Sequence, residues 1–96
     1  MLQEFKSDLD QYVTQVEGNI ISNMDGETVM LSIKNGKYYN LGVIGGYIWE
    51  CVQEPVSLKN LIKSIQVEYD VTEEKCKTDL LPFIEKLRNE GLIKIY

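Results

Sequence analysis

Hydrophobic and polar residues follow a strand-like pattern up to residue 41 and a helix-like pattern after it. Three runs are rich in strand-forming residues, namely 12–16 (YVTQV), 28–33 (TVMLSI) and 37–41 (KYYNL). Residues 23–26 (NMDG) and 34–36 (KNG) have the composition of turns. The pattern therefore predicts three short strands, of which the last two form an antiparallel hairpin.

The pairing within this hairpin depends on the length of the turn. A two-residue turn at Asn35 and Gly36 would leave no consistent apolar face on the two strands. A three-residue turn with Gly36 in a left-handed bulge pairs Ile33 with Lys37 and Leu31 with Tyr39. We predict this second register because it collects one apolar face, made of Val29, Leu31, Tyr39 and Leu41.

After residue 42 the apolar side chains recur at helical spacing. A first helix is predicted over about 43–53, ending before Pro55. Ser57 and Thr72 each precede an amphipathic stretch and are predicted N-caps of two further helices, the last covering 73–90. Three strands followed by three helices predict an α+β fold with a winged helix-turn-helix-like arrangement, as a three-stranded antiparallel sheet followed by three helices.

The composition of the chain excludes several classes of function. The 96 residues suit a single domain over 1–96, and no apolar run is long enough to span a membrane. Fifteen acidic residues against ten basic ones give a net charge of -5, which disfavours nucleic acid as a partner. The absence of histidine removes the histidine-based catalytic and metal sites, and Cys51 and Cys76 lack metal-ligand spacing. We therefore expect a cytoplasmic protein without catalytic residues, metal or cofactor.

Three candidate signals have simpler structural explanations. Residues 42–46 (GVIGG) follow a strand and open a helix, but they lack the spacing of a phosphate-binding loop and suit close helix packing. Glu73 and Glu74 suit a helix N-terminus rather than acid–base work. Lys59 and Lys63 lie one turn apart, yet the acidic last helix opposes DNA binding in the winged-helix manner.

An edge strand is the remaining feature that predicts a function. If the strands pair in sequence order, strand 37–41 has a neighbour on one side only, and Lys37 alone protects its open edge. An unprotected edge can receive an extended peptide as an added strand. The alternative is that a terminal segment or a second copy of the chain covers it, so we expect a monomer or a weak dimer.

A family resemblance supports the binding of a peptide at this edge. The stretch DGETVMLSIKNGKYYNLGVIGGYIWECV, together with the helical region up to residue 93, resembles the PqqD-like recognition elements for ribosomally synthesised precursor peptides. The wording YYNL-x-x-x-G-x-x-IW is most similar to the stand-alone leader-binding subunit of split lasso-peptide proteases. The PqqD chaperone, which presents a precursor to a radical SAM enzyme, is the alternative.

The resemblance implies a binding protein that is not an enzyme. The precursor's leader would add to strand 37–41 and enter the cleft beside helix 73–90, and a separate cysteine leader peptidase or another modifying enzyme would receive it. The sequence does not decide which flank of this helix faces the peptide. We favour the flank of Cys76 over that of Leu81 and Ile84, because it mixes polar and apolar residues as binding grooves do. The predicted peptide-binding residues are Lys37, Tyr38, Tyr39, Asn40, Leu41, Cys76, Asp79, Leu80 and Phe83.

Overall fold

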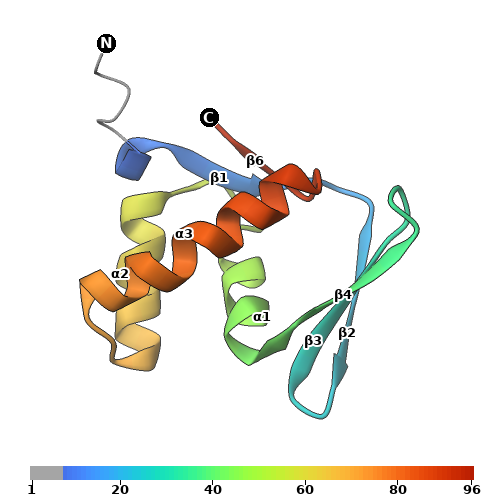
Figure 1. Ribbon diagram of the computed structural model, residues 1–96, viewed down its shortest axis with the longest axis horizontal. Coiled ribbons are helices and arrows are strands. Elements are labelled where there is room, and N and C mark those ends of the chain that lie inside the picture. The colour runs from blue at the N-terminus through green and yellow to red at the C-terminus, as the bar shows by residue number, and fades with distance from the viewer. Residues whose placement is uncertain (1–7) are drawn as a thin grey trace.

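The computed structural model describes residues 8–96, which form two small sheets and three helices (Figure 1). None of the helices in this part of the chain is long and apolar enough to cross a membrane. In chain order the elements are the 3-10 helix η2 (Asp8–Asp10), β1 (Tyr12–Gln15), β2 (Asn19–Met24), β3 (Glu27–Ser32), β4 (Lys37–Leu41), α1 (Gly42–Cys51), β5 (Val56–Ser57), α2 (Leu58–Tyr69), α3 (Glu73–Asn89) and β6 (Ile93–Ile95).

The predicted fold class is confirmed, because an antiparallel sheet in the order β2-β3-β4 precedes the three helices. The prediction was wrong about which segment forms the third strand of this sheet. The run at 12–16 forms β1, which pairs with β5 and β6 in a second sheet, and the third strand of the first sheet is β2. The apolar residues of β2, which are Ile20, Ile21 and Met24, are all exposed. The sequence of β2 therefore lacks the alternation of apolar and polar residues that marks a strand with one buried face.

The β2–β3 connection is a two-residue turn at Asp25 and Gly26. Both residues have positive φ, at 54° and 85°, which is the backbone of a type I′ hairpin turn. Met24 and Glu27 close the turn as partners. Because the residues that flank such a turn form a hydrogen-bonded pair, this turn fixes which backbone groups of β3 point toward β2.

The predicted register between β3 and β4 was wrong by one residue. Ser32, not Ile33, pairs with Lys37, and Met30 pairs with Tyr39. A four-residue loop joins the strands, with Gly36 at φ 66° donating its N–H to the carbonyl of Ser32 at 2.8 Å. The Ser32 hydroxyl accepts a hydrogen bond from the Asn35 N–H at 3.1 Å, so this polar side chain is satisfied although it is buried.

The slip turns β3 over but leaves β4 facing the same way. Met30 and Ser32 are buried, whereas Val29 and Leu31, the predicted core residues, lie on the opposite face and are half-buried. Tyr39 and Leu41 of β4 pack against the core as predicted.

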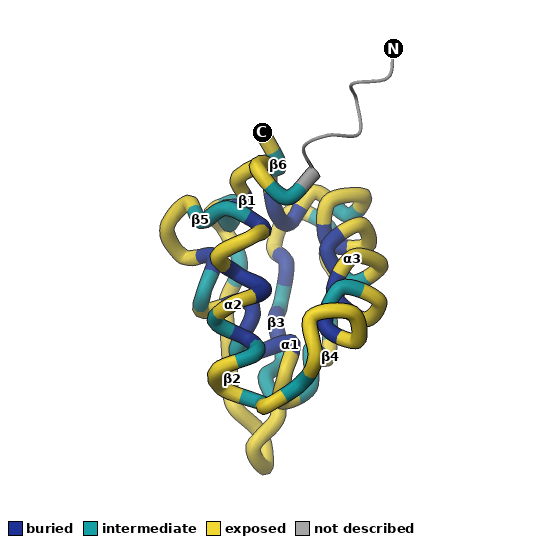
Figure 2. Tube along the Cα trace, turned by 90° about the vertical axis from the view of Figure 1, so that its left-hand side faces the viewer, coloured by how far each residue is buried: buried dark blue, intermediate teal, exposed yellow. Residues whose placement is uncertain are grey.

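The helices cover one face of the sheet. Helix α1 lies between the sheet and α2, and α3 runs across from α2 to β6 (Figure 1). A side chain at Gly46 of α1 would meet the Cβ of Thr28 on β3 at 2.7 Å, so the helix backbone lies directly on the sheet. The predicted caps are confirmed: Ser57 accepts from the N–H of Asn60, and Thr72 from that of Lys75, each at 3.1 Å. Figure 2 shows in dark blue the buried residues of β3, α2 and α3, which lie between these elements.

Candidate functional site

The first component of the site is the free edge of β4. The sheet order places β4 at an edge, with β3 as its partner on the other side. The turn that pairs Met24 with Glu27 directs alternate residues of β3 toward β2, so Met30 and Ser32 bond toward β4. Their partners Tyr39 and Lys37 bond inward, which leaves the N–H and C=O groups of the alternate residues, Tyr38 and Asn40, facing the open edge.

A cavity of about 270 Å³ opens beside the end of this strand. Its lining includes Leu41 of β4, Ile44 and Ile48 of α1, and Tyr69 of α2. The side formed by α3 consists of Lys75, Cys76, Asp79, Leu80 and Phe83. The lining is mostly apolar with a few polar groups at the rim, which is the usual composition of a site that binds an apolar side chain.

Phe83 connects the cavity to the edge strand. A side chain on Gly45 would lie 3.1 Å from the Phe83 ring and 3.1 Å from the Cβ of Leu41, so the ring packs against the bare backbone of α1. This glycine lets α3 approach α1 at this point. Phe83 is therefore half-buried and still lines the cavity.

Charge is confined to the rim. Lys75 and Asp79 form an exposed ion pair at 3.0 Å. Burial raises the pKa of the Cys76 thiol, and the negative charges of Asp79 and Glu73 raise it further, so the thiol stays protonated at neutral pH. The thiol thus contributes a weakly polar wall rather than a nucleophile. Within residues 8–96 there is no group of three potential metal ligands.

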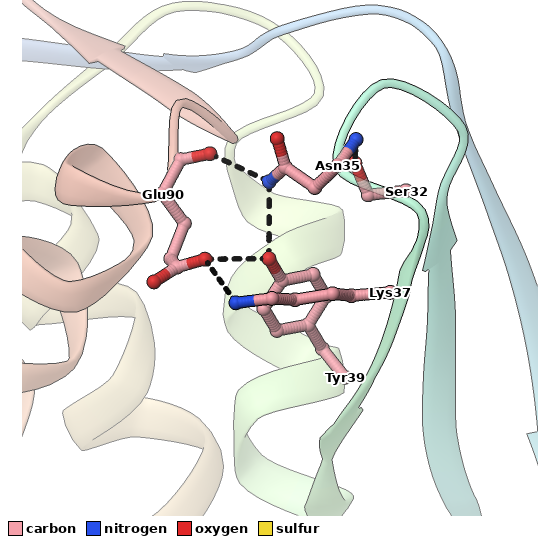
Figure 3. Close-up of polar contacts among 5 residues, drawn as sticks. All are labelled: Ser32, Asn35, Lys37, Tyr39 and Glu90. Atoms are coloured by element: carbon pink, nitrogen blue, oxygen red, sulfur yellow. Dashed lines mark hydrogen bonds and ion pairs between the residues drawn. The ribbon is translucent and has the colours of Figure 1, made fainter.

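A polar cluster joins the start of β4 to the end of α3 (Figure 3). The Tyr39 hydroxyl donates to Glu90 Oε1 at 2.6 Å, and Lys37 Nζ lies 3.5 Å from the same oxygen. The Asn35 side-chain amide donates to the Tyr39 hydroxyl at 3.0 Å and to the Glu90 backbone carbonyl at 2.9 Å. We call Asn35, Lys37, Tyr39 and Glu90 the clasp.

The predicted site residues fall into two groups. Leu41, Cys76, Asp79, Leu80 and Phe83 come together around the cavity, on the flank of α3 that we favoured. Lys37, Tyr38, Tyr39 and Asn40 lie along the edge strand outside it, with Tyr38 74% exposed. Leu81, on the other flank, is exposed away from the cavity lining.

The chain matches known proteins both in sequence and in fold. The family model of PqqD, described as coenzyme PQQ synthesis protein D, matches residues 27–93. The chain belongs to the PqqD family. This PqqD family member is also similar to a solved structure described as TbiB1 in complex with the TbiA(beta) leader peptide. The two are 26% identical with a TM-score of 0.74, and the match covers 84% of this chain and 94% of the other. No curated protein matches the chain.

Sequence reasoning missed several residues of this family member's site. Ile44 and Tyr69 are not among the predicted peptide-binding residues, yet both line the cavity. Asn35 was predicted as part of a turn, and Glu90 only as the last residue of the helix 73–90. Nothing in the local sequence brings these two together, because the contact joins positions 55 residues apart.

The carboxylate of Glu90 provides a test of the clasp in this PqqD family member. The hydrogen bond from Tyr39 lowers the pKa of Glu90, and the charges of Lys37 and Lys86 lower it further. A lowered carboxylate pKa stabilises the fold above the ordinary glutamate pKa, and this contribution is lost as pH falls through the lowered value. We expect Tyr39→Phe to raise the pKa of Glu90 toward its ordinary value in a carbon-13 NMR titration of the side-chain carboxyl. An unchanged pKa would show that the hydroxyl does not bond this carboxylate in solution.

Proposed function

We propose that this protein binds the leader of a ribosomally synthesised precursor peptide without catalysing a reaction on it. The leader adds as a strand to the open edge of β4 and inserts side chains into the cavity beside α3. The observation that carries the proposal is the meeting of an unpaired strand edge with an apolar cavity, linked through Leu41 and Phe83. The similarity to TbiB1, whose solved structure contains a leader peptide, supports it.

The two components would contribute differently to recognition. Backbone groups of Tyr38 and Asn40 can pair with any extended peptide, since strand addition reads the main chain. Selectivity would come from alternate side chains of the peptide, which point to the same face of the sheet as Tyr39 and Leu41. On that face the cavity offers an apolar surface with the Lys75–Asp79 pair at its rim.

A second part of the proposal concerns the enzyme that acts on the bound precursor. We infer a separate cysteine leader peptidase of lasso-peptide biosynthesis, acting in the cytoplasm where the precursor is made. The resemblance of YYNL-x-x-x-G-x-x-IW to the leader-binding subunits of split lasso proteases supports this choice. A second candidate is presentation of the precursor to a radical SAM enzyme, which the family description as a coenzyme PQQ synthesis protein favours.

Calorimetry with purified components tests the central proposal. The probes are synthetic leaders of precursor peptides sought among the genes that neighbour this chain's gene, titrated into the protein with every processing enzyme absent. Scrambled leaders are the control. We expect saturable binding of the leader alone. Binding of duplex DNA that weakens steeply with salt, or a dimer in sedimentation that the leader does not dissociate, would instead indicate one of the rival functions.

Asn40→Pro tests whether the peptide docks on β4. Proline removes one backbone donor and is tolerated at sheet edges, so the hairpin should stay folded. We expect leader affinity to fall about tenfold, or roughly 1.4 kcal/mol. Titration calorimetry gives the affinity, and circular dichroism with a thermal melt establishes folding.

The matched control is Asn40→Ala. The Asn40 side chain donates to Glu27 Oε1 at 2.9 Å and accepts from the N–H of Gly42 at 2.9 Å, and both variants lose these contacts. Only proline also removes the outward N–H, so the alanine variant should bind the leader more tightly than the proline variant. Tyr39→Pro, which removes an inward donor, should unfold the domain. A folded Asn40→Pro protein with the affinity of Asn40→Ala would place the peptide elsewhere.

Phe83→Ala and Leu81→Ala compare the two flanks of α3. Phe83 lines the cavity, whereas Leu81 is exposed outside it. Loss of an aromatic wall should weaken leader binding by about tenfold or more, and loss of Leu81 should change it little. Affinities are compared well below both melting temperatures, because Phe83 also supports the fold. The reverse order of effects would assign the peptide to the other flank.

A further inference from the structure

The clasp lies at the opposite end of β4 from the cavity. Lys37 and Tyr39 belong to the start of β4, and Glu90 is the C-cap of α3 (Figure 3). Among the described residues, the side-chain hydrogen bonds and ion pairs between α3's end and the β3–β4 hairpin are those of the clasp. The other ion pairs on α3, such as Glu85–Arg88, stay within the helix.

The clasp is built from both sides by the local backbone. On the hairpin, the buried Ser32 hydroxyl accepts the N–H of Asn35 and so holds the loop that presents the Asn35 amide. On the helix, Glu90 ends α3, where backbone carbonyls lack intrahelical partners. The Glu90 carbonyl is therefore free to accept from Asn35 while its carboxylate accepts from Tyr39.

The geometry of the clasp is that of strong hydrogen bonds. The contact of 2.6 Å between the Tyr39 hydroxyl and Glu90 Oε1 is in the range of charge-assisted O–H···O⁻ bonds. Tyr39 and Glu90 are both partly shielded from water, which strengthens the bond relative to a surface contact. The more exposed Lys37, at 3.5 Å, contributes less.

Helix α1 lies against both the hairpin and α3. This helix contacts β3 at Gly46 and receives Phe83 of α3 at Gly45, so it forms the floor between the edge strand and α3. These contacts hold the cavity end of the cleft. The clasp joins the hairpin to the end of α3 away from the cavity.

We propose that Tyr39 and Glu90 are positioning residues that hold α3 at the separation from β4 that a bound strand requires. This inference rests on the proposed function, since it assigns the clasp to the leader-binding cleft. Tyr39 acts with its side chain on the helix side, and its backbone bonds inward to β3, so it need not give up either contact when a peptide pairs with Tyr38 and Asn40. A cleft fixed before binding spares the peptide the entropic cost of ordering it.

Variants that remove one polar group of the clasp at a time test the proposal. Tyr39→Phe deletes the hydroxyl and keeps the ring, and Glu90→Ala deletes the carboxylate. Each should weaken binding of the same leader, labelled with fluorescein, by about fivefold in fluorescence anisotropy. The double variant should lose no more than the larger single effect, because both changes break the same bond.

Two further variants separate positioning from general stability. Glu90→Gln keeps an oxygen that accepts the Tyr39 hydrogen bond, so it should restore most of the affinity lost in Glu90→Ala. Glu85→Ala removes an exposed carboxylate that pairs with Arg88 of the same helix at 2.7 Å. This variant should leave leader affinity unchanged. Thermal melts of all variants report how far each one also changes the fold.

The outcomes are distinct. Failure of the wild-type protein to bind the leader overturns the proposed function itself. If the wild type binds, the positioning role is overturned by folded Tyr39→Phe and Glu90→Ala proteins of unchanged affinity. It is also overturned by tighter binding, which would make the clasp a latch that must open. A loss in every variant that follows melting temperature, with no rescue by Glu90→Gln, likewise contradicts it.

Discussion

The pairing of Ser32 with Lys37 across a four-residue loop is the constraint on which the rest of the structure depends. Side chains in a strand alternate between faces, so this single register places Met30 and Ser32 in the core and turns Val29 and Leu31 outward. The same register places Tyr39 opposite Met30, on the side where α3 ends. A slip of one residue along β3 would expose the buried pair and remove the loop geometry that presents Asn35 to Glu90.

The candidate site also follows from this constraint. The loop holds the start of β4 against Glu90, and the glycine surface of α1 holds Phe83 near the end of β4. Between these two points the strand keeps one edge unpaired beside a mostly apolar cavity. Strand pairing supplies affinity that tolerates many sequences, and the cavity supplies choice among them. Such a division suits a protein that recognises a peptide segment.

The sequence predicted the features that local physical chemistry determines. Ser57 and Thr72 cap helices as expected, since an N-cap depends on residues only three positions apart. The buried stripes of α2 and α3 and the helix-side orientation of Tyr39 and Leu41 also follow from periodicity. The strand β2 was missed because its apolar residues stay exposed and carry no alternation.

The remaining errors concern interactions between distant parts of the chain. The register of β3 was chosen to bury Leu31, but the loop gained a hydrogen bond by burying Ser32, and the apolar pattern alone does not weigh the two. The contact of Glu90 with Tyr39 joins residues 51 positions apart and depends on where α3 ends in space.

Amide hydrogen exchange on β4 tests the central claim most directly. In the free protein the N–H groups of Lys37 and Tyr39 bond inward, whereas those of Tyr38 and Asn40 face the open edge. If the leader adds as a strand, exchange at Tyr38 and Asn40 slows when the leader binds, and exchange at Lys37 and Tyr39 changes little. Saturable leader binding that leaves Tyr38 and Asn40 exchanging at their free rates would contradict the account.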